Sequence, residues 1–457
     1  KLKGQIRLTG QINTESLITG GYIMKILFQV KLLSLLALAA FTPGCKDNTA
    51  AETDKSSIYV YGKDSVKVSV GTKPVDFPAI REDGTVTFSL AAPEAKSVVL
   101  VNTTGGWTSD AWPQGASIPM TKDTEGNWTV TIGPLAPEFY NYAFVVDGVY
   151  ALDPINPLVD RDGVRYRSEL QISGEKTFYY EYHDVPHGTV SHVYIPYPTF
   201  GIQKRTTIYT PPGYETDIAR YPVIFLQHGG GGDEDAWTDL GRVPEIMDNL
   251  IAKGEIEPMI VVMSNIYSDQ VAGRNYFPVV PPPGSRPDDL SFPKALVTDL
   301  VPFIDRTYRT VADAESRAVI GLSRGGMMSL YAGFSNLDKF SWIGTLAGGL
   351  PNLPGVAKKV ETPADPILFR GPDITKTIDK DKVLELLPAM NKGSNGKIRL
   401  LYVSVGAQDG LITAHRDLRD LLAEQGVNCE YIEVPGYGHE WAYWRVAYQD
   451  FVQKVFK

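Results

Sequence analysis

Cysteine is scarce in this chain, which has two cysteines among 457 residues, at positions 45 and 429. A framework of several disulfides is therefore excluded, and Cys429, which starts a predicted strand, is most simply a small buried apolar residue. The chain also lacks any cluster of lysine and arginine, and its formal net charge is −9. Because nucleic acid is bound through basic surfaces, this charge balance argues against nucleic acid as a partner.

Long apolar segments are absent as well. The stretch Leu32–Phe41 has ten residues, which is too few to span a bilayer. It follows Met24 and Lys25 in the form of a secretory signal. We expect residues 1–23 to lie outside the mature fold and residues 24–44 to be a signal peptide.

The end of this segment, where Cys45 follows Gly44, resembles a bacterial lipobox, in which the cysteine carries lipid. Lys46-Asp47 resembles the surface-export signal of lipoproteins in Bacteroidetes. The resemblance implies an outer-membrane lipoprotein, at the cell surface or on the periplasmic face, with residues 45–57 as a polar tether. The alternative is an ordinary cleaved signal with an incidental cysteine, which also sends the protein out of the cytoplasm.

Residues 58–170 carry short alternating apolar runs, such as Thr85–Leu90 and Ser97–Val101, separated by Gly, Pro and Asn. Alternation without a helical period predicts a β-sandwich. The segments Phe88–Pro93 and Tyr140–Gly148 resemble the early-set, immunoglobulin-like module found beside glycogen-branching enzymes and some esterases.

That resemblance implies either glucan binding or a bracing role for the module. Trp107, Trp112 and Trp128 are the rings that would stack on sugar, although Trp128 lies in a strand pattern that favours a core position. Residues 171–188 are predicted to form a linker.

From residue 189 to residue 457, strand patterns alternate with helical ones. Strands are predicted at Tyr221–Gln227 and Met259–Asn265, and a helix at Phe292–Tyr308. This alternation predicts a mainly parallel sheet with helices on both faces, as in an α/β hydrolase.

Ala318–Ile320 leads through Gly321-Leu322-Ser323-Arg324-Gly325 into a helical pattern. A serine flanked by these glycines, between strand and helix, is typical of a nucleophile elbow. The glycines leave room for the sharp turn, and the start of the helix places the amide of Arg324 where an oxyanion would form. Ser323 is therefore the predicted nucleophile.

An acid and then a histidine should follow the serine along the chain. Asp409 comes soon after the predicted strand Arg399–Val405, at the strand end where α/β sheets collect functional groups. His439 lies in a glycine-rich loop after the predicted strand Cys429–Val434. We predict Asp409 as the acid and His439 as the base. The alternatives are that Asp409 is a helix-capping or turn aspartate and that His439 is a plain loop histidine. His415 is predicted to be a surface or capping histidine.

The predicted strand Tyr221–Gln227 runs into His228 and four glycines. Loops of this HGGG type supply backbone amides to oxyanion holes. We predict that the amide of Gly229 or Gly230 faces Ser323, with a merely flexible turn as the alternative.

Together these motifs resemble the esterase-D-type α/β hydrolases of carbohydrate esterase family one, which include feruloyl, acetyl xylan and enterochelin esterases. The matching segments are Leu226–Gly231 with Trp237, Gly321–Gly326, Gly406–Asp409, and His439–Trp441 with Trp444. An early-set module ahead of such a domain resembles the arrangement of feruloyl esterases in gut Bacteroidetes. One departure is Arg324, where the family often has Met, and its side chain would narrow or charge the pocket.

The resemblance implies that Ser323 attacks an ester carbonyl while His439 takes its proton and Asp409 orients the imidazole. No metal or organic cofactor is needed for this chemistry. The expected substrate is an ester-decorated polysaccharide, with release of ferulate from arabinoxylan-type glycans as the favoured reaction.

Substrate contacts are less specific in the sequence. Trp237, Trp441 and Trp444 are candidates either for an aromatic acyl pocket or for the core, and Arg274 either contacts substrate or is a loop charge. Two other functions stay open. One is an acetyl xylan or siderophore esterase, and the other is a surface glycan-binding protein with an inactive hydrolase domain.

Overall fold

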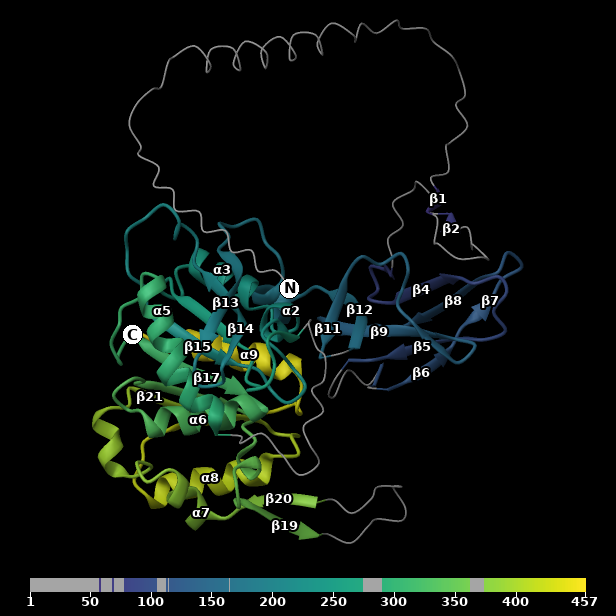
Figure 1. Cartoon of the computed structure of the whole chain (residues 1–457). Coiled ribbons are helices and arrows are strands. Elements are labelled where there is room, and N and C mark those ends of the chain that lie inside the picture. Colours follow the sequence, from purple (N-terminus) through teal and green to yellow (C-terminus); the bar gives the residue numbers. More distant parts are fainter. Residues whose placement is uncertain are drawn as a thin grey trace, which may run out of the picture. The chain divides into compact units, whose positions relative to one another are not determined.

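The structure of the chain is a computed structural model (Figure 1). It describes residues 57–58, 68–69, 78–104, 112–113, 115–163, 165–273, 290–361 and 374–457. The predicted signal peptide, Cys45, Trp107 and Arg274 lie outside these ranges. Within them, no helix has both the length and the apolar character needed to cross a membrane.

The chain divides into two compact units, residues 1–73 and 74–457. In the first unit, β1 (Ser57–Ile58) and β2 (Val68–Ser69) pair antiparallel. All elements described below belong to the second unit.

The second unit begins with the predicted β-sandwich. One sheet has the order β3-β4-β8-β7, and the other has the order β11-β12-β9-β5-β6 with β10 on β9. The strands are β3 (Ala79–Ile80), β4 (Val86–Ala91), β5 (Val98–Asn102), β6 (Ser117–Pro119), β7 (Thr121–Lys122), β8 (Asn127–Ile132), β9 (Glu138–Val146), β10 (Val149–Ala151), β11 (Val159–Asp162) and β12 (Arg165–Ile172). A short 3₁₀ helix, η1 (Glu175–Tyr180), follows in the predicted linker.

Alternate side chains of the strands fill the sandwich core. In β4, Val86, Phe88 and Leu90 are buried, because successive strand residues point to opposite faces. Trp128 is also in this core, as its strand pattern predicts. Trp112 is fully buried, so this candidate for stacking on sugar is instead part of the core.

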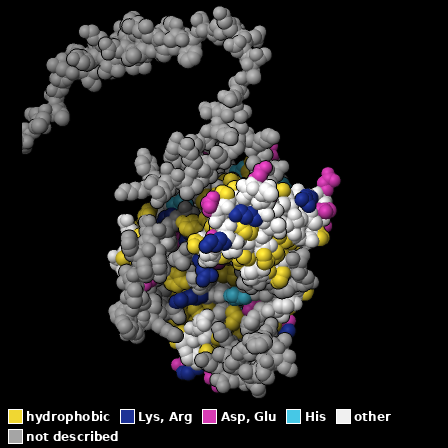
Figure 2. Space-filling view, turned by 90° about the vertical axis from the view of Figure 1, so that its right-hand side faces the viewer, with side chains coloured by type: hydrophobic (Ala, Val, Ile, Leu, Met, Phe, Trp, Pro, Cys, Tyr) yellow, Lys and Arg dark blue, Asp and Glu magenta, His cyan; other side chains and the backbone are white. Residues whose placement is uncertain are grey.

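Some apolar side chains of the sandwich remain at the surface, and Figure 2 shows hydrophobic groups beside Lys and Arg side chains on one face of the molecule. Among the described residues of the sandwich, the exposed large apolar side chains are those of Ile80, Val149, Tyr150, Ile155, Leu158, Val159 and Tyr166.

The rest of the second unit is built on an eight-stranded sheet in the order β13-β14-β16-β15-β17-β18-β21-β22. The pairs β13–β14 and β14–β16 are antiparallel and all the others are parallel. The strands are β13 (Thr189–Tyr197), β14 (Ile202–Thr210), β15 (Val223–Gln227), β16 (Ile260–Ser264), β17 (Arg317–Leu322), β18 (Trp342–Leu346), β21 (Leu400–Gly406) and β22 (Glu430–Val434). The mainly parallel sheet predicted from the sequence is confirmed.

Helices cover both faces of this sheet. In β15, Val223 and Phe225 pack in the same cluster as side chains of α4 to α6 and α8, whereas Ile224 and Leu226 pack with side chains of α3 and α9. Burial on both faces explains why the strand is apolar throughout. The helices are α2 (Ala236–Asp239), α3 (Val243–Ala252), α4 (Ser291–Ala295), η3 (Leu296–Leu300), α5 (Val301–Thr307), α6 (Ser323–Ser335), η4 (Leu350–Asn352), α7 (Lys380–Leu386), η5 (Lys392–Gly396), α8 (Ile412–Glu424) and α9 (Trp441–Val452).

Two features differ from the expected pattern. The helix predicted at Phe292–Tyr308 forms in three segments, with the π-helical turn η3 between α4 and α5. Pro302 has no amide hydrogen to donate, so a regular α-helical ladder cannot continue through this point. The antiparallel pair β19 (Ala357–Glu361) and β20 (Ile374–Ile378) was not predicted.

Candidate active site

The turn between β17 and α6 holds Ser323 in a left-handed backbone conformation, with φ of 50°. Non-glycine residues adopt this conformation only when the surroundings enforce it. Here the enforcing contact is the end of β15: a Cβ on Gly321 would lie 2.7 Å from the carbonyl oxygen of Gln227, and a Cβ on Gly325 would overlap that of His228. The two glycines therefore allow the strand end to press against the turn and present Ser323.

The three residues predicted as a triad lie in one hydrogen-bonded chain. His439 Nε2 is 2.9 Å from Ser323 Oγ, and His439 Nδ1 is 2.7 Å from Asp409 Oδ2. Since a carboxylate only accepts, Nδ1 carries the proton and Nε2 is left to accept the serine proton. Asp409 is 2% exposed, whereas the His439 side chain is 37% exposed. The acid is shielded and the base remains open to a substrate.

The carboxyl ends of parallel strands bring these side chains together. Asp409 lies in the loop after β21, and its Oδ1 accepts the amide of Leu411 at 2.8 Å. His439 lies in the loop between β22 and α9. The next residue, Glu440, is 2% exposed and accepts the amide of Gly438 at 2.9 Å. Burial, with the nearby Glu138 carboxylate as a smaller cause, raises the pKa of Glu440 to about 7.

An aromatic cluster packs against the imidazole of His439. The ring of Trp444 meets the imidazole edge-to-face, with centroids 5.0 Å apart, and Trp441 meets Trp444 at 5.1 Å. Trp441 is partly exposed, whereas Trp444 is 7% and Trp237 is 1% exposed. Trp237 donates its ring N–H to the carbonyl oxygen of Gln227 at 3.0 Å. Trp237 is therefore placed in the core and presents no ring face to a substrate, which corrects its prediction as a contact.

The glycine loop after β15 lies beside the nucleophile, since a Cβ on Gly229 would come within 3.2 Å of Ser323 Cβ. The amide of Gly231 donates to the Tyr267 hydroxyl at 2.6 Å and that of Gly232 to the Gly229 carbonyl at 3.3 Å. Among the residues that the structure describes, the amides of Gly229 and Gly230 have no acceptor in the protein. They are the two loop amides predicted for an oxyanion.

His228 fixes the backbone of this loop. Its Nδ1 donates to the Gly229 carbonyl at 2.8 Å and its Nε2 accepts the amide of Ile266 at 3.0 Å. The ring must be neutral to make both bonds, and burial lowers the pKa of His228 to about 4. His228 was not predicted to have a role beyond its place in the motif.

Arg324 follows the nucleophile in the first turn of α6, where helix amides have no carbonyl acceptor four residues earlier in the helix. This is the position predicted to complete an oxyanion hole with its amide. Its guanidinium carbon lies 5.3 Å from the centre of the Tyr267 ring. The side chain of Arg324 therefore lies against Tyr267, whose hydroxyl accepts the amide of Gly231 in the glycine loop.

The prediction that His415 is a surface histidine is wrong, because its side chain is fully buried. Its Nε2 donates to the carbonyl oxygen of Gly348 at 3.1 Å, and the amide of Gly349 donates to the Ser323 carbonyl at 2.8 Å. Burial lowers the pKa of His415 to about 4. The spacing of His415, Leu418 and Leu422 along α8 is that of a buried helix face, and this signal in the sequence would have placed the ring inside.

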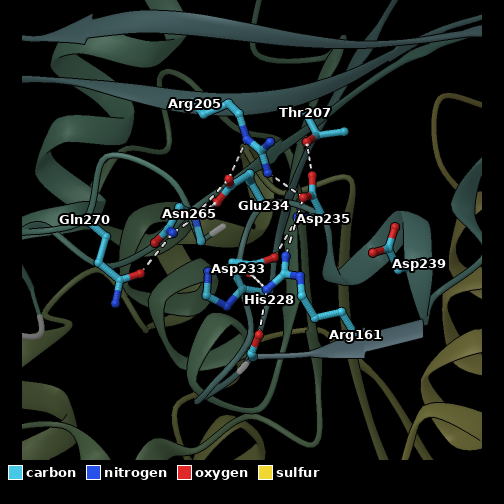
Figure 3. A network of polar contacts seen from close by, with 12 residues as sticks. Arg161, Arg205, Thr207, His228, Asp233, Glu234, Asp235, Asp239, Asn265 and Gln270 are labelled. Carbon is cyan, nitrogen blue, oxygen red and sulfur yellow. Dashed lines mark hydrogen bonds and ion pairs between the residues drawn. The ribbon is translucent and has the colours of Figure 1, made fainter. Parts of the chain in front are cut away.

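Three acidic residues for which the sequence predicts no role follow the glycine loop. Asp233, Glu234 and Asp235 are 5%, 0% and 1% exposed, and Figure 3 shows them facing the guanidinium groups of Arg161 and Arg205. Only their position after the HGGG-type loop marks them in the sequence.

Comparisons with known proteins agree with this geometry. The sequence pattern of the family described as "Putative esterase" matches residues 199–453, and that of "Carbohydrate-binding module 48 (Isoamylase N-terminal domain)" matches residues 74–160. An "Endo-1,4-beta-xylanase/feruloyl esterase" of Xylanibacter ruminicola is 33% identical over 281 residues, covering 60% of this chain and 36% of the relative. The chain therefore spans about a third of the length of that protein.

An "Acetyl esterase" of Caldicellulosiruptor saccharolyticus is 23% identical over 240 residues, covering 50% of this chain and 81% of the relative. The crystal structure of the enterobactin esterase FES from Shigella flexneri, in the presence of enterobactin, is similar with a TM-score of 0.55. It is 17% identical and covers 81% of this chain and 92% of that one, so the likeness concerns the fold. Because the esterase pattern covers more than half of the chain and includes Ser323, Asp409 and His439, the chain belongs to the "Putative esterase" family.

Proposed function

We propose that this chain is a serine esterase that acts on ester-decorated plant polysaccharide and releases ferulate from arabinoxylan-type glycans. The observation that carries the proposal is the hydrogen-bonded chain of Ser323, His439 and Asp409 at a strand-to-helix turn. Membership of an esterase family supports the ester chemistry. A relative named as a xylanase and feruloyl esterase supports the glycan and the acyl group.

The geometry accounts for acylation of the serine. His439 Nε2, 2.9 Å from Ser323 Oγ, takes the hydroxyl proton as the oxygen attacks the ester carbonyl. The imidazolium that forms is stabilised by the buried Asp409 carboxylate on its other side. His439 then gives the proton to the leaving sugar oxygen, and an acyl-serine remains.

Water repeats the same steps on the acyl-serine, with His439 again as base, and releases the acid. In both tetrahedral intermediates the negative oxygen needs preorganised donors. The amide of Arg324 and the amide of Gly229 or Gly230 serve this role in the proposal. A lost donor of this kind costs about 3 kcal/mol of transition-state stabilisation.

The aromatic surroundings of His439 support an aromatic acyl group. Trp441 is partly exposed beside the buried Trp444, and flat rings stack on a feruloyl ring with little loss of conformational freedom. The guanidinium of Arg324 adds a positive charge on the side of Tyr267.

The test is release of ferulate from methyl ferulate and from a feruloylated arabinoxylan oligosaccharide, with 4-nitrophenyl acetate as the acetyl ester. Ser323→Ala is expected to lower kcat by about 10³-fold or more on the active substrates. The matched control is Ser335→Ala, since Ser335 is the exposed last residue of the same helix, and its activity should equal that of the unchanged protein.

Cleavage of the acetyl ester alone would keep the serine mechanism and move the substrate to an acetylated glycan, in line with the acetyl esterase relative. Absence of hydrolysis on all three esters would overturn the proposal and favour a glycan-binding protein without activity.

We further propose export and lipid attachment at Cys45, on the support of the signal-like segment at residues 24–44. Metabolic labelling with a radioactive fatty acid in a bacterial host tests it. Label should enter the protein and should be lost in Cys45→Ala, with Cys429→Ala as the control that keeps it. Label retained in Cys45→Ala would overturn lipidation at this cysteine.

A further inference from the structure

The glycine loop of the proposed oxyanion hole is anchored by the acidic segment Asp233-Glu234-Asp235 that directly follows it. All three carboxylates are nine-tenths or more buried. Carboxylates in such surroundings stay ionised only when cationic and hydrogen-bonding partners compensate the loss of water. The position of this segment, and of the glycines before it, therefore depends on its partners.

One set of partners comes from the hydrolase sheet. Arg205 of β14 pairs through Nε with Glu234 at 2.7 Å and through its terminal nitrogen with Asp235. Asn265 donates to Glu234 at 3.0 Å, and Thr207 donates to Asp235 at 3.0 Å. These contacts, drawn in Figure 3, hold Glu234 and Asp235.

The other partner comes from the sandwich. Arg161 of β11 is 5% exposed; its two terminal nitrogens pair with Asp233 and, at 3.4 Å, with Asp235. In the part of the chain that the structure describes, Asp233 has otherwise only the amide of Asp235 as a donor, at 3.0 Å. Figure 3 shows Arg161 reaching this carboxylate from the strand of the sandwich.

The backbone of the sandwich also touches the glycine loop. Arg161 donates to the carbonyl of Gly163 at 2.6 Å, at the end of β11. Gly163 has φ of +60°, and a Cβ on it would overlap the carbonyl oxygen of Gly231. The same arginine thus fixes a turn of the sandwich that lies directly against the loop.

We propose that Arg161 is a positioning residue for the oxyanion loop, so that the sandwich is a structural part of the active site as well as an appended module. Arg161 compensates the charge of Asp233. Asp233 directly follows the glycine loop and so fixes the end of the loop that carries the Gly229 and Gly230 amides. Without Arg161, the three buried carboxylates are left with the guanidinium of Arg205. Repulsion between the carboxylates then moves the glycine loop. Displacement of a catalytic group by about 1 Å costs on the order of 10²-fold in rate.

This inference rests on the proposed esterase function, and it predicts a loss on small esters that have no glycan to bind. In the full chain, Arg161→Gln is expected to lower kcat on 4-nitrophenyl acetate by about 10- to 100-fold, with KM within about threefold, because a misplaced oxyanion donor acts on the transition state. Arg161→Lys, which keeps the charge, should recover part of the loss. kcat is expressed per serine titrated with a fluorophosphonate, so that unfolded protein does not count.

A second readout does not depend on activity. Hydrogen exchange measured by mass spectrometry should show faster exchange of the peptide that spans residues 228–239 in Arg161→Gln, with exchange of β17 unchanged. The matched control is Arg167→Gln, because Arg167 is a similarly buried arginine of the same module, paired through Nε with Asp160 at 3.1 Å. It should leave both kcat and exchange of the loop as in the unchanged protein.

An Arg161→Gln protein with unchanged kcat per titrated serine would overturn the inference, and so would an equal loss in Arg167→Gln, which would indicate a general effect of disturbing the sandwich. If the unchanged protein hydrolyses no ester, the proposed function fails, and the exchange comparison alone decides whether Arg161 positions the loop. Unchanged exchange would then refute it.

Discussion

Three histidines lie at or near the site, and burial gives them different chemistry. His228 and His415 are fully buried, and burial lowers the pKa of each to about 4, so both are neutral at physiological pH and act as fixed hydrogen-bonding groups. His439 alone is open to solvent on one side and contacts Ser323. The residue that must exchange protons with substrate is therefore the one whose side chain is exposed.

A pH-dependent stability follows for His415. Its pKa is about 4 in the folded protein and ~6.5 when unfolded, so its contribution is intact above pH 6.5 and is lost as pH falls toward 4. His415→Gln keeps a donor for the Gly348 carbonyl and removes the titration. Relative to this variant, the unchanged protein should lose roughly 1.4 kcal/mol of unfolding free energy per pH unit in that window. Urea unfolding at pH 7.5, 6 and 5 measures it, and parallel pH curves for the two proteins would contradict it.

The element that most constrains the site is the turn from β17 to α6 against the end of β15. Gly321 and Gly325 are required because a Cβ at either position would collide with the carbonyl of Gln227 or His228. This steric requirement adds to the conformational preference of the turn for glycine. A side chain at position 325 would push apart the nucleophile and the oxyanion loop at once.

Gly325→Ala is therefore expected to lower the unfolding free energy by about 1–3 kcal/mol, as overpacking does, and to lower kcat by ~10²-fold through misplacement. Gly396→Ala is the control, because a Cβ there meets no atom within 4 Å. Urea unfolding and ester hydrolysis measure the two effects. Full activity in Gly325→Ala would show that the strand end yields to the added methyl group.

The strands of the sheet and the positions of the triad residues can largely be predicted from the sequence. Apolar runs such as Val223–Gln227 are strands because both faces of the sheet are covered, and the order of Ser323, Asp409 and His439 follows from the order of the strands that carry them. These features are local or depend on a fixed topology, so pattern and spacing are enough to find them.

Features that depend on packing between distant segments were missed. His415 was predicted at the surface from its polar side chain alone, although its spacing with Leu418 and Leu422 indicates the buried face of α8. Its partner there, the Gly348 carbonyl, comes from a distant segment and could not be predicted. Trp237 was an equal candidate for pocket and core until its 1% exposure placed it. Arg161 is 72 residues before Asp233 and in a different module, so no local pattern links them.

At the scale of the molecule, the sandwich and the hydrolase domain share buried charges. Arg445 of α9 pairs with Glu138 of β9 at 2.7 Å, and their side chains are 5% and 8% exposed. Lys176 adds a second cation 2.9 Å from the same carboxylate. Burial raises the pKa of Glu138, but the two cations outweigh it and hold the pKa below its ordinary value. The pair is therefore charged at neutral pH, and it ties the two modules together.

Removing one member should destabilise both modules at once. In Glu138→Gln the Arg445 guanidinium stays buried without its counter-charge, and the expected loss is about 3–5 kcal/mol of unfolding free energy. In the control Glu424→Gln, which breaks the exposed pair of Glu424 with Lys380, the loss should be roughly 0–1 kcal/mol. Urea unfolding, followed by far-UV circular dichroism and by ester hydrolysis, measures both.

If the modules depend on each other, activity and structure of the Glu138→Gln protein are lost in one transition at lower urea. A sandwich that unfolds separately while hydrolysis persists would show that the buried pair joins two independent domains.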